Sequence, residues 1–321
     1  MKTTNALKKV AIRTIEDEAA AIKNLSKSVN DDFLQSVQHI MKSKGRVVVT
    51  GIGKSAIIGQ KIVASFNSTG TPAIFMHAAD AIHGDLGIIQ KDDIVICISK
   101  SGETPEIRVL VPLLKQLGSL LISMVGNTAS YLALQSDFVI DTTVSKEACP
   151  NNLAPTSSTT AQLVMGDALA VCLLEARGFT AGDFAKFHPG GALGKKMYLK
   201  VSDLFVRNQK PLVYETDDIR QVIVEISSKR LGATAVLNGN KLTGIITDGD
   251  LRRMLEKDLD LRNLKATDIM SPAPKTIKPS TLVIDALTLM RKNNITQLLV
   301  VDKSGYKGVI HIHDILKEGI I

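Results

Sequence analysis

The chain of 321 residues contains no tryptophan, and aromatic residues make up only 4% of it. Bases of single-stranded nucleic acid stack on aromatic side chains, so this scarcity removes the usual platform for such binding. The 39 lysines and arginines are scattered along the chain without a basic block. We therefore expect no nucleic acid partner, and we interpret the net charge of +7 as a solvated surface that also favours an anionic small substrate.

Cysteine is scarce as well. Cys97, Cys149 and Cys172 lie far apart, are odd in number and form no Cys-x-x-Cys pair. This pattern indicates neither a disulfide framework nor a zinc site. We expect three reduced thiols in a packed interior.

Long apolar runs are also missing. No run approaches the ~20 residues that span a bilayer, and the N-terminus carries mixed charge where a signal peptide has an unbroken apolar core. The composition, with 45% hydrophobic and 22% charged residues, is that of an ordinary globular protein. We therefore expect a cytoplasmic protein with no membrane partner.

Short apolar runs alternate with helical segments through the first half of the chain. Fully apolar strands separated by helices are typical of a parallel sheet that is covered on both faces. The pattern predicts a doubly wound α/β domain with a parallel five-stranded sheet, whose ligands bind at the carboxyl ends of the strands. Two helices with a capping break at residues 30–32 precede the sheet, and a long apolar helix over residues 158–175 follows it. The predicted strands are residues 47–49, 73–76, 94–98, 120–125 and 138–140.

The last third of the chain repeats itself. Residues 201–205 match residues 266–270, and residues 244–251 match residues 308–315, with a period of about 64 residues. A unit this small buries little apolar surface alone, whereas a pair can share a core. The repeat predicts two copies of one small α/β unit.

The loop after the first predicted strand, residues 51–55, opens a helix and carries Lys54. Free backbone N–H groups at a helix start form an anion site, and a lysine there lies over the ligand crevice. A nucleoside triphosphate loop needs glycine where Val48 stands, and a dinucleotide site needs an acid where His77 ends the second strand. Both alternatives are disfavoured, and the cation of Lys54 favours binding of a small anion.

The loop after the third predicted strand, residues 99–104, is more specific. It contains three hydroxyl side chains just before a predicted helix, those of Ser99, Ser101 and Thr104. One hydroxyl is enough to cap a helix, whereas three can donate to three phosphate oxygens while the helix dipole favours the negative charge. We call this segment the phosphate loop and predict that it binds a phosphate group.

Side chains that can move protons follow the predicted strands or lie in loops near them. Each also has an ordinary structural interpretation, as a helix-dipole partner, a solvated acid or a satisfied loop histidine. Combined with a phosphate site and a lysine, they fit proton transfer between adjacent carbons of a sugar, which needs a base, a proton donor at oxygen and a cation for the enediolate. The candidates are Glu106, Glu147, His77, His83 and His188.

At these residues the sequence resembles a known family. The phosphate loop and the strand order resemble the sugar isomerase (SIS) domain, and the repeat resembles a pair of CBS domains. The combination resembles the D-arabinose 5-phosphate isomerase family over nearly the whole chain, and the motifs that carry the resemblance are residues 51–55, 83–87, 146–150, 153–159 and 188–194. The expected domains are an SIS domain over residues 1–200, a first CBS domain over 201–263 and a second CBS domain over 264–321.

The resemblance implies interconversion of D-ribulose 5-phosphate and D-arabinose 5-phosphate, a step that supplies Kdo for lipopolysaccharide or capsule. It implies four catalytic residues and substrate contacts by His77 and His83, and together with the phosphate loop we expect eight residues that bind substrate. The catalytic positions are Lys54, Glu106, Glu147 and His188, and the substrate-binding positions are Ser55, Gly70, Thr71, His77, His83, Ser99, Ser101 and Thr104.

The resemblance also implies the cofactors and partners. Turnover in the family requires no metal. Zinc inhibits some members, and His77 is the candidate zinc ligand here. A homotetramer with sites shared between subunits is expected. The first CBS copy has Thr247 and Asp250 at the spacing that holds a nucleotide. The second copy has His311 in place of the threonine, so at most one nucleotide site is expected to be intact.

The sequence departs from the family pattern after the first loop, where Ala56 and Ile57 replace glycine and histidine. This leaves the detailed shape of that loop open, though not the role of Lys54. In the resulting hypothesis the phosphate loop holds the phosphate, His188 or His83 helps to open the sugar ring, and Lys54 stabilises the enediolate. Either Glu147 or Glu106 moves the proton between C1 and C2, and the sequence leaves that choice open.

Two alternatives accompany this hypothesis. An SIS–CBS sensor would bind a sugar phosphate without turnover, as SIS-containing transcription regulators do, but the first 40 residues here offer only amphipathic helices where a regulator needs a DNA-binding domain. The other alternative is an isomerase of a different phosphosugar, such as a heptose phosphate.

Overall fold

The computed structural model describes residues 4–256 and 263–320, which divide into two compact units between Phe187 and His188. Residues 1–3, 257–262 and 321 belong to the expected SIS and CBS ranges and lie outside the described residues. The division falls earlier than the expected SIS boundary at residue 200. The reason is that α9 (Ala192–Tyr198) packs on α14 (Val283–Asn293) of the second unit. Lys195 Nζ of α9 also donates to Oε2 of Glu318, which follows α15 (Ile312–Lys317), over 2.9 Å.

An all-parallel sheet in the order β2-β1-β3-β4-β5 forms the centre of the first unit. Val47 of β1 pairs with Ala73 of β2 on one side and with Ile94 of β3 on the other, so the strands end at a common carboxyl edge. All five predicted strands and the doubly wound fold are confirmed. The strands are β1 (Val47–Gly51), β2 (Ala73–His77), β3 (Ile94–Ser99), β4 (Leu120–Val125) and β5 (Phe138–Asp141).

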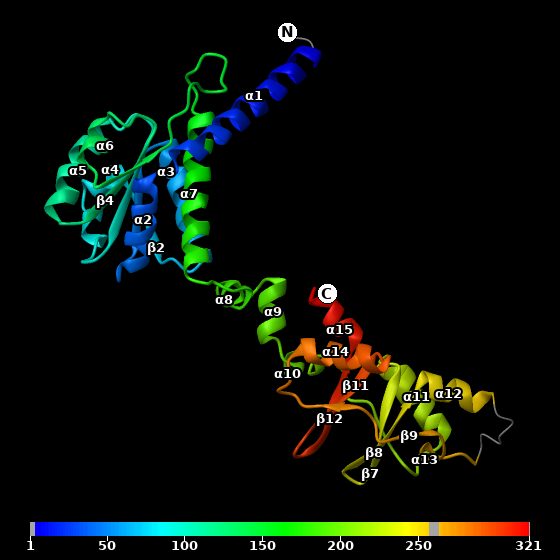
Figure 1. Ribbon diagram of the computed structural model, residues 1–321. Helices are drawn as coiled ribbons and strands as arrows, with labels where there is room; N and C mark the ends of the chain where they lie inside the picture. The colour runs from blue at the N-terminus through cyan, green and yellow to red at the C-terminus, as the bar shows by residue number, and fades with distance from the viewer. Residues whose placement is uncertain (1–3, 257–262, 321) are drawn as a thin grey trace. The chain divides into compact units, whose positions relative to one another are not determined.

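Helices cover both faces of this sheet (Figure 1). One face packs against α2, α3 and α7 around Phe33, Ile62 and Leu169, and the other packs against α4, α5 and α6 around Ile107 and Leu132. The helical segments of this unit are α1 (Thr4–Asn24), η1 (Leu25–Ser28), α2 (Asp31–Lys42), α3 (Lys54–Ser68), α4 (Ala78–Ala81), η2 (Asp85–Ile88), α5 (Pro105–Gln116), α6 (Tyr131–Gln135), α7 (Ser157–Ala176) and α8 (Ala181–Phe187).

Among the described helices, α7 is long and apolar enough to cross a membrane. Half of it is buried, however, and Met165, Leu169 and Leu173 belong to the core of the first unit. We therefore interpret α7 as a core helix. The cytoplasmic location stays a prediction.

The cysteines follow the expectation only in part. Cys97 in β3 is buried, but Cys149 is half-buried and Cys172 is exposed, and all three are free thiols. Cys172 was wrongly placed in the interior, because α7 turns this side chain to solvent while the neighbouring Leu173 faces the core.

The second unit contains two sheets, β6-β7-β8-β9 and β10-β11-β12. Each has a parallel pair followed by an antiparallel hairpin, and the hairpin register shifts after Val236 in one and after Val300 in the other, which are 64 residues apart. This confirms the repeat. The strands are β6 (Leu212–Tyr214), β7 (Ala233–Asn238), β8 (Lys241–Thr247), β9 (Ser271–Pro272), β10 (Thr276–Ile277), β11 (Gln297–Asp302) and β12 (Gly305–His311), and the helices besides α9 are α10 (Val201–Phe205), α11 (Ile219–Lys229), α12 (Asp248–Leu255), α13 (Ala266–Ile269), α14 (Val283–Asn293) and α15 (Ile312–Lys317).

Candidate active site

A cavity of about 270 Å³ opens at the carboxyl edge of the parallel sheet. The loops that follow β1 and β3 and the start of α7 line it, which is where doubly wound folds bind their ligands. The two loops that the sequence singled out therefore meet at one site. The predicted site residues that line the cavity are Lys54, Ser55, Ser99, Ser101 and Thr104.

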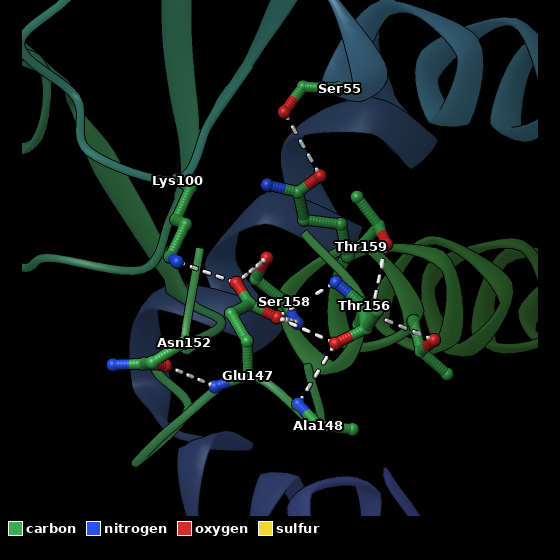
Figure 2. Close-up of polar contacts among 10 residues, drawn as sticks. Ser55, Lys100, Glu147, Ala148, Asn152, Thr156, Ser158 and Thr159 are labelled. Atoms are coloured by element: carbon green, nitrogen blue, oxygen red, sulfur yellow. Dashed lines mark hydrogen bonds and ion pairs between the residues drawn. The ribbon is translucent and has the colours of Figure 1, made fainter. Parts of the chain in front are cut away.

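The first loop brings Lys54 to the cavity because α3 begins at this residue. Ser55, the next residue, donates from Oγ to Oε1 of Gln162 on α7 over 3.2 Å (Figure 2). Ala56 is buried and Ile57 is exposed, as in the first turn of an ordinary amphipathic helix. The two departures from the family pattern are therefore accommodated, and Lys54 keeps its place on the cavity.

The phosphate loop ends where α5 begins. Ser99 Oγ accepts the N–H of Gly102 over 3.1 Å, and Ser101 Oγ accepts the N–H two residues further on over 3.3 Å. A hydroxyl that accepts in this way still has its own O–H to donate. Thr104 Oγ1 is buried and has no hydrogen-bond partner among the described residues. An anionic oxygen in the cavity would give all three hydroxyls an acceptor.

The carboxylate of Glu147 is buried and accepts hydrogen bonds on both oxygens (Figure 2). Oε1 accepts from Lys100 Nζ and from Ser158 Oγ, each over 2.5 Å. Oε2 accepts from the N–H of Thr156 over 2.8 Å, from Thr156 Oγ1 over 3.2 Å and from the N–H of Ser158 over 3.1 Å. Lys100 and Ser158 themselves line the cavity, so Glu147 lies directly behind its wall.

The start of α7 supplies most of these donors. The first N–H groups of a helix have no partners within it, and the positive end of the helix dipole favours a carboxylate there. Burial raises the pKa of a carboxyl group, but the hydrogen bonds to Glu147, above all that from Lys100, outweigh burial and lower its pKa to about 2. Glu147 is therefore charged at neutral pH, yet it accepts a proton poorly while Lys100 occupies Oε1.

The sequence analysis missed four polar residues that line the cavity, Lys100, Ser158, Thr159 and Gln162. Lys100 stands inside the phosphate loop between two hydroxyls, and this position was a signal for it. Ser158 and Gln162 are four residues apart on α7, a spacing that puts both on one face of the helix. Two polar residues on one face at the start of a helix with an apolar core face were the signal for them.

Besides Glu147, Gly70 and Thr71, three more predicted residues of the first unit lie outside the lining of this cavity. Glu106 is half-buried in the first turn of α5. His77 ends β2 beside Gly51 of β1, and His83 is exposed in the turn that follows α4. Their catalytic and substrate-binding roles stay predictions.

Gly70 and Thr71 lie at the opposite edge of the sheet, because they precede β2 whereas the phosphate loop follows β3. Arg177 Nη1 donates to the Gly70 carbonyl over 2.7 Å and to Thr71 Oγ1 over 2.5 Å. Within one chain the structure does not bring these two residues to the cavity. His188 is the first residue of the second unit, so the site built from the first unit does not include it.

The inhibitory zinc site also stays a prediction. His77 Nδ1 lies 3.8 Å from Asp80 Oδ2. Among residues 4–256 and 263–320 no cluster of three or more histidine, cysteine, aspartate or glutamate side chains is arranged to hold a metal ion.

The candidate nucleotide residues of the first CBS copy form a capping box at the start of α12. Thr247 Oγ1 donates to Asp250 Oδ2 over 2.6 Å, and Arg253 Nη2 donates to Asp250 Oδ1 over 2.6 Å. Burial raises the pKa of Asp250, but the bonds from Thr247 and Arg253 lower it below its ordinary value. His311 caps α15 with Asp314 in the same way. Both oxygens of Asp250 are thus engaged, and a nucleotide there stays a prediction.

Comparisons with known proteins agree with these features. The SIS domain model matches residues 39–172, and the CBS domain model matches residues 201–257 and 266–320. Arabinose 5-phosphate isomerase KdsD of Pseudomonas aeruginosa is 48% identical over 314 residues, which cover 97% of this chain and 96% of that protein. This chain belongs to the arabinose 5-phosphate isomerase family.

Other relatives extend the match. KdsD of Escherichia coli K12 is 46% identical over 306 residues, which cover 95% of this chain and 93% of that protein. Among solved structures, an Escherichia coli CFT073 protein in complex with arabinose 5-phosphate is 40% identical with a TM-score of 0.57, and the match covers 59% of this chain and 100% of that chain. The resemblance seen in the sequence is confirmed.

Proposed function

We propose that this chain is an aldose–ketose isomerase that interconverts D-ribulose 5-phosphate and D-arabinose 5-phosphate, a step that supplies Kdo for lipopolysaccharide or capsule. The observation that carries the proposal is the identity of 48% with an arabinose 5-phosphate isomerase over 97% of the chain. The cavity supports it, because lysine side chains and the phosphate-loop hydroxyls line one space at the carboxyl edge of the sheet.

The phosphate loop suits the 5-phosphate of a pentose. Three hydroxyls have O–H groups to donate, α5 presents the free N–H groups of its first turn, and its dipole favours the negative charge. Lys54 and Lys100 add positive charge to the same cavity. A sugar anchored at its C5 phosphate keeps C1 and C2 free for proton transfer.

The proton moves between C2 and C1 through an enediolate, and Lys54 is the cation that we assign to the charge developing on oxygen. Glu147, directly behind the cavity wall, is one candidate base, and Glu106 in the first turn of α5 is the other. A positioned base is worth ~10²–10⁴ in rate. We assign ring opening to His188 or His83.

The test is isomerisation in D₂O followed by NMR. When the enzyme is incubated with D-ribulose 5-phosphate, we expect D-arabinose 5-phosphate to form with deuterium at its C2. A protein that binds pentose 5-phosphates without exchange would instead be a sensor. Exchange into a heptose phosphate but not into pentose 5-phosphates would point to a different isomerase, and both outcomes contradict the proposal.

Three further properties belong to the proposal. Sedimentation should give a homotetramer whose sites are shared between subunits. Turnover should survive a chelator, and zinc should inhibit the wild type more than the His77→Ala variant. Calorimetry with adenine and cytidine nucleotides tests the CBS pair, and binding there should weaken in Thr247→Ala.

A further inference from the structure

The pair formed by Lys100 and Glu147 joins a partly exposed cation to a fully enclosed carboxylate. The Lys100 side chain is 46% exposed, whereas that of Glu147 is 0% exposed. Lys100 lines the cavity and Glu147 lies behind it, so this ion pair links the substrate space to a buried acid (Figure 2).

The two partners are held very differently. Glu147 keeps four donors from Thr156 and Ser158 if Lys100 leaves, and its own N–H is fixed by Asn152 Oδ1 over 2.7 Å. Lys100 has a flexible four-carbon stem. Its backbone carbonyl accepts a hydrogen bond over 3.0 Å at the end of β4, so its side chain can turn while the loop stays in place.

A substrate phosphate competes directly for this lysine. Lys100 stands between Ser99 and Ser101, so a phosphate bound by these hydroxyls comes within reach of Nζ. A phosphate group carries roughly twice the charge of a carboxylate at neutral pH, and its oxygens accept strong hydrogen bonds from lysine. Lys100 thus has one anionic partner in the free enzyme and a stronger one in the complex.

We propose that Lys100 is a positioning residue that couples phosphate binding to the basicity of Glu147. The bound phosphate draws Nζ away from Oε1 and leaves this oxygen to take the C2 proton. The C2–H bond breaks as the O–H bond forms, the electron pair enters the C1–C2 bond, and the C1 oxygen takes the charge beside Lys54. The protonated Glu147, whose proton exchanges with solvent during turnover, then protonates C1, and the ketose carbonyl forms at C2 as its hydroxyl proton passes to the C1 oxygen. This inference rests on the proposed function.

The coupling has a physical cause in the surroundings of Glu147. Once the cation leaves, the strongest contact that lowers the pKa of Glu147 is lost while the burial that raises it remains, so its pKa rises. A base with a pKa nearer the working pH removes a proton from carbon more effectively. Glu147 is therefore a stronger base when a phosphate occupies the loop.

The first experiment measures the protonation of Glu147 by NMR of protein with ¹³C-labelled glutamate carboxyl groups, with Glu147→Gln to identify the resonance. Saturating inorganic phosphate should raise the pKa of Glu147 in the wild type by about 1–3 units, the size expected for loss of a neighbouring opposite charge. Lys100→Met should raise it similarly without phosphate, and phosphate should then add little.

The matched control is Lys115→Met, which removes the same charge from the last turn of α5, where Nζ lies 3.3 Å from Gln135 Oε1. It should titrate like the wild type. If phosphate does not change the pKa of Glu147 in the wild type, the inference is overturned. This measurement uses only the wild-type protein, so it does not depend on a variant folding. An equal phosphate effect in the wild type and in Lys100→Met also overturns it, because that result is plain repulsion between two anions. Neither arm depends on turnover.

Steady-state kinetics of isomerisation are a second measurement. The activity of the wild type in this experiment tests the proposed function separately. Lys100→Met should raise KM for the sugar phosphate by about tenfold or more, as for loss of a charged hydrogen bond, and should move the acid limb of kcat/KM to higher pH. Lys100→Arg should restore the limb. A lower kcat with KM and limb unchanged indicates a merely structural lysine and contradicts the inference, whereas a wild type without exchange at C2 contradicts the proposed function.

Discussion

At the scale of single residues, Glu147 is a charged carboxylate that is buried away from solvent. Burying a carboxylate is costly unless donors replace the lost water, and Glu147 receives them from Lys100, Thr156 and Ser158. These contacts also tie the phosphate loop to the start of α7. Changing this one carboxylate should therefore affect both chemistry and stability.

Substitution of either candidate base tests which of them acts. Glu147→Gln keeps the shape of the side chain but cannot accept the proton, and kcat should fall by ~10²–10⁴. Glu106→Gln should also lose turnover if Glu106 takes part in proton transfer. Steady-state isomerisation rates decide, and a variant with full activity removes its glutamate from the mechanism.

The pKa of Glu147 makes stability depend on pH. Its folded-state pKa of about 2 lies below the ordinary 4.5, so its contribution is complete above pH 4.5 and is lost as the pH falls toward 2. The unfolding free energy of the wild type should therefore decrease from about pH 5 to about pH 3 more steeply than that of Glu147→Gln. Urea denaturation at several pH values measures this, and parallel curves would refute it.

At the scale of elements, the phosphate loop depends on a tight contact with the next turn of the fold. Gly102 has φ +66°, and a Cβ there would lie 2.1 Å from Ser130 Oγ, just before α6. The N–H of Leu132 also donates to the Gly102 carbonyl over 3.1 Å. A side chain at position 102 would strain the backbone and clash with Ser130. Relief of that clash would move the phosphate loop.

Gly102→Ala should therefore reduce stability and phosphate affinity together. Gly118→Ala is the matched control, since Gly118 has φ +73° but nothing within 4 Å of a Cβ. The control should cost about 1–3 kcal/mol through backbone strain alone, and Gly102→Ala should cost more. Urea denaturation and titration with inorganic phosphate measure the two effects, and equal losses in both variants would show that the contact with Ser130 does not matter.

The helix that carries Lys54 is fixed by its buried face. Ile62 of α3 is fully buried, while Ile57 on the same helix is 65% exposed. Ile62→Ala should lower the unfolding free energy by about 2–5 kcal/mol, and Ile57→Ala should change it by no more than about 0.5 kcal/mol. Similar losses in the two variants, measured by urea denaturation, would show that Ile57 is covered in the assembled protein.

At the scale of the whole molecule, the chain has separate cores. Ile62 and Phe66 belong to a core of the first unit, and Leu298 and Val300 belong to a core of the second. Units with their own cores unfold as separate cooperative steps. The candidate cavity lies in the first unit and the repeat lies in the second, so each can be perturbed alone.

Calorimetry should therefore show two transitions. Ile62→Ala should lower one midpoint and Leu298→Ala the other, because each side chain is fully buried in only one unit. A single transition that both variants lower equally would mean that the units unfold as one.

The sequence by itself determined whatever depends on neighbouring residues. Buried strands appear as short apolar runs, and the repeat appears as self-similarity, so the sheet and the paired units were predictable. That Ser99, Ser101 and Thr104 line a cavity was predictable too, since they lie within six consecutive residues and the carboxyl edge of a parallel sheet is a known ligand site.

Only the tertiary structure decided which distant groups meet. Lys100 and Glu147 are separated by 47 positions, and nothing local reveals that one neutralises the other. Gly70 precedes β2 and therefore lies at the opposite edge of the sheet from the cavity. Glu106 lies close to the end of β3 in the sequence, yet it does not line the cavity. Local patterns report the burial of a side chain, whereas the partner of a charge depends on how strands and helices are packed, and that packing sets the pKa of Glu147.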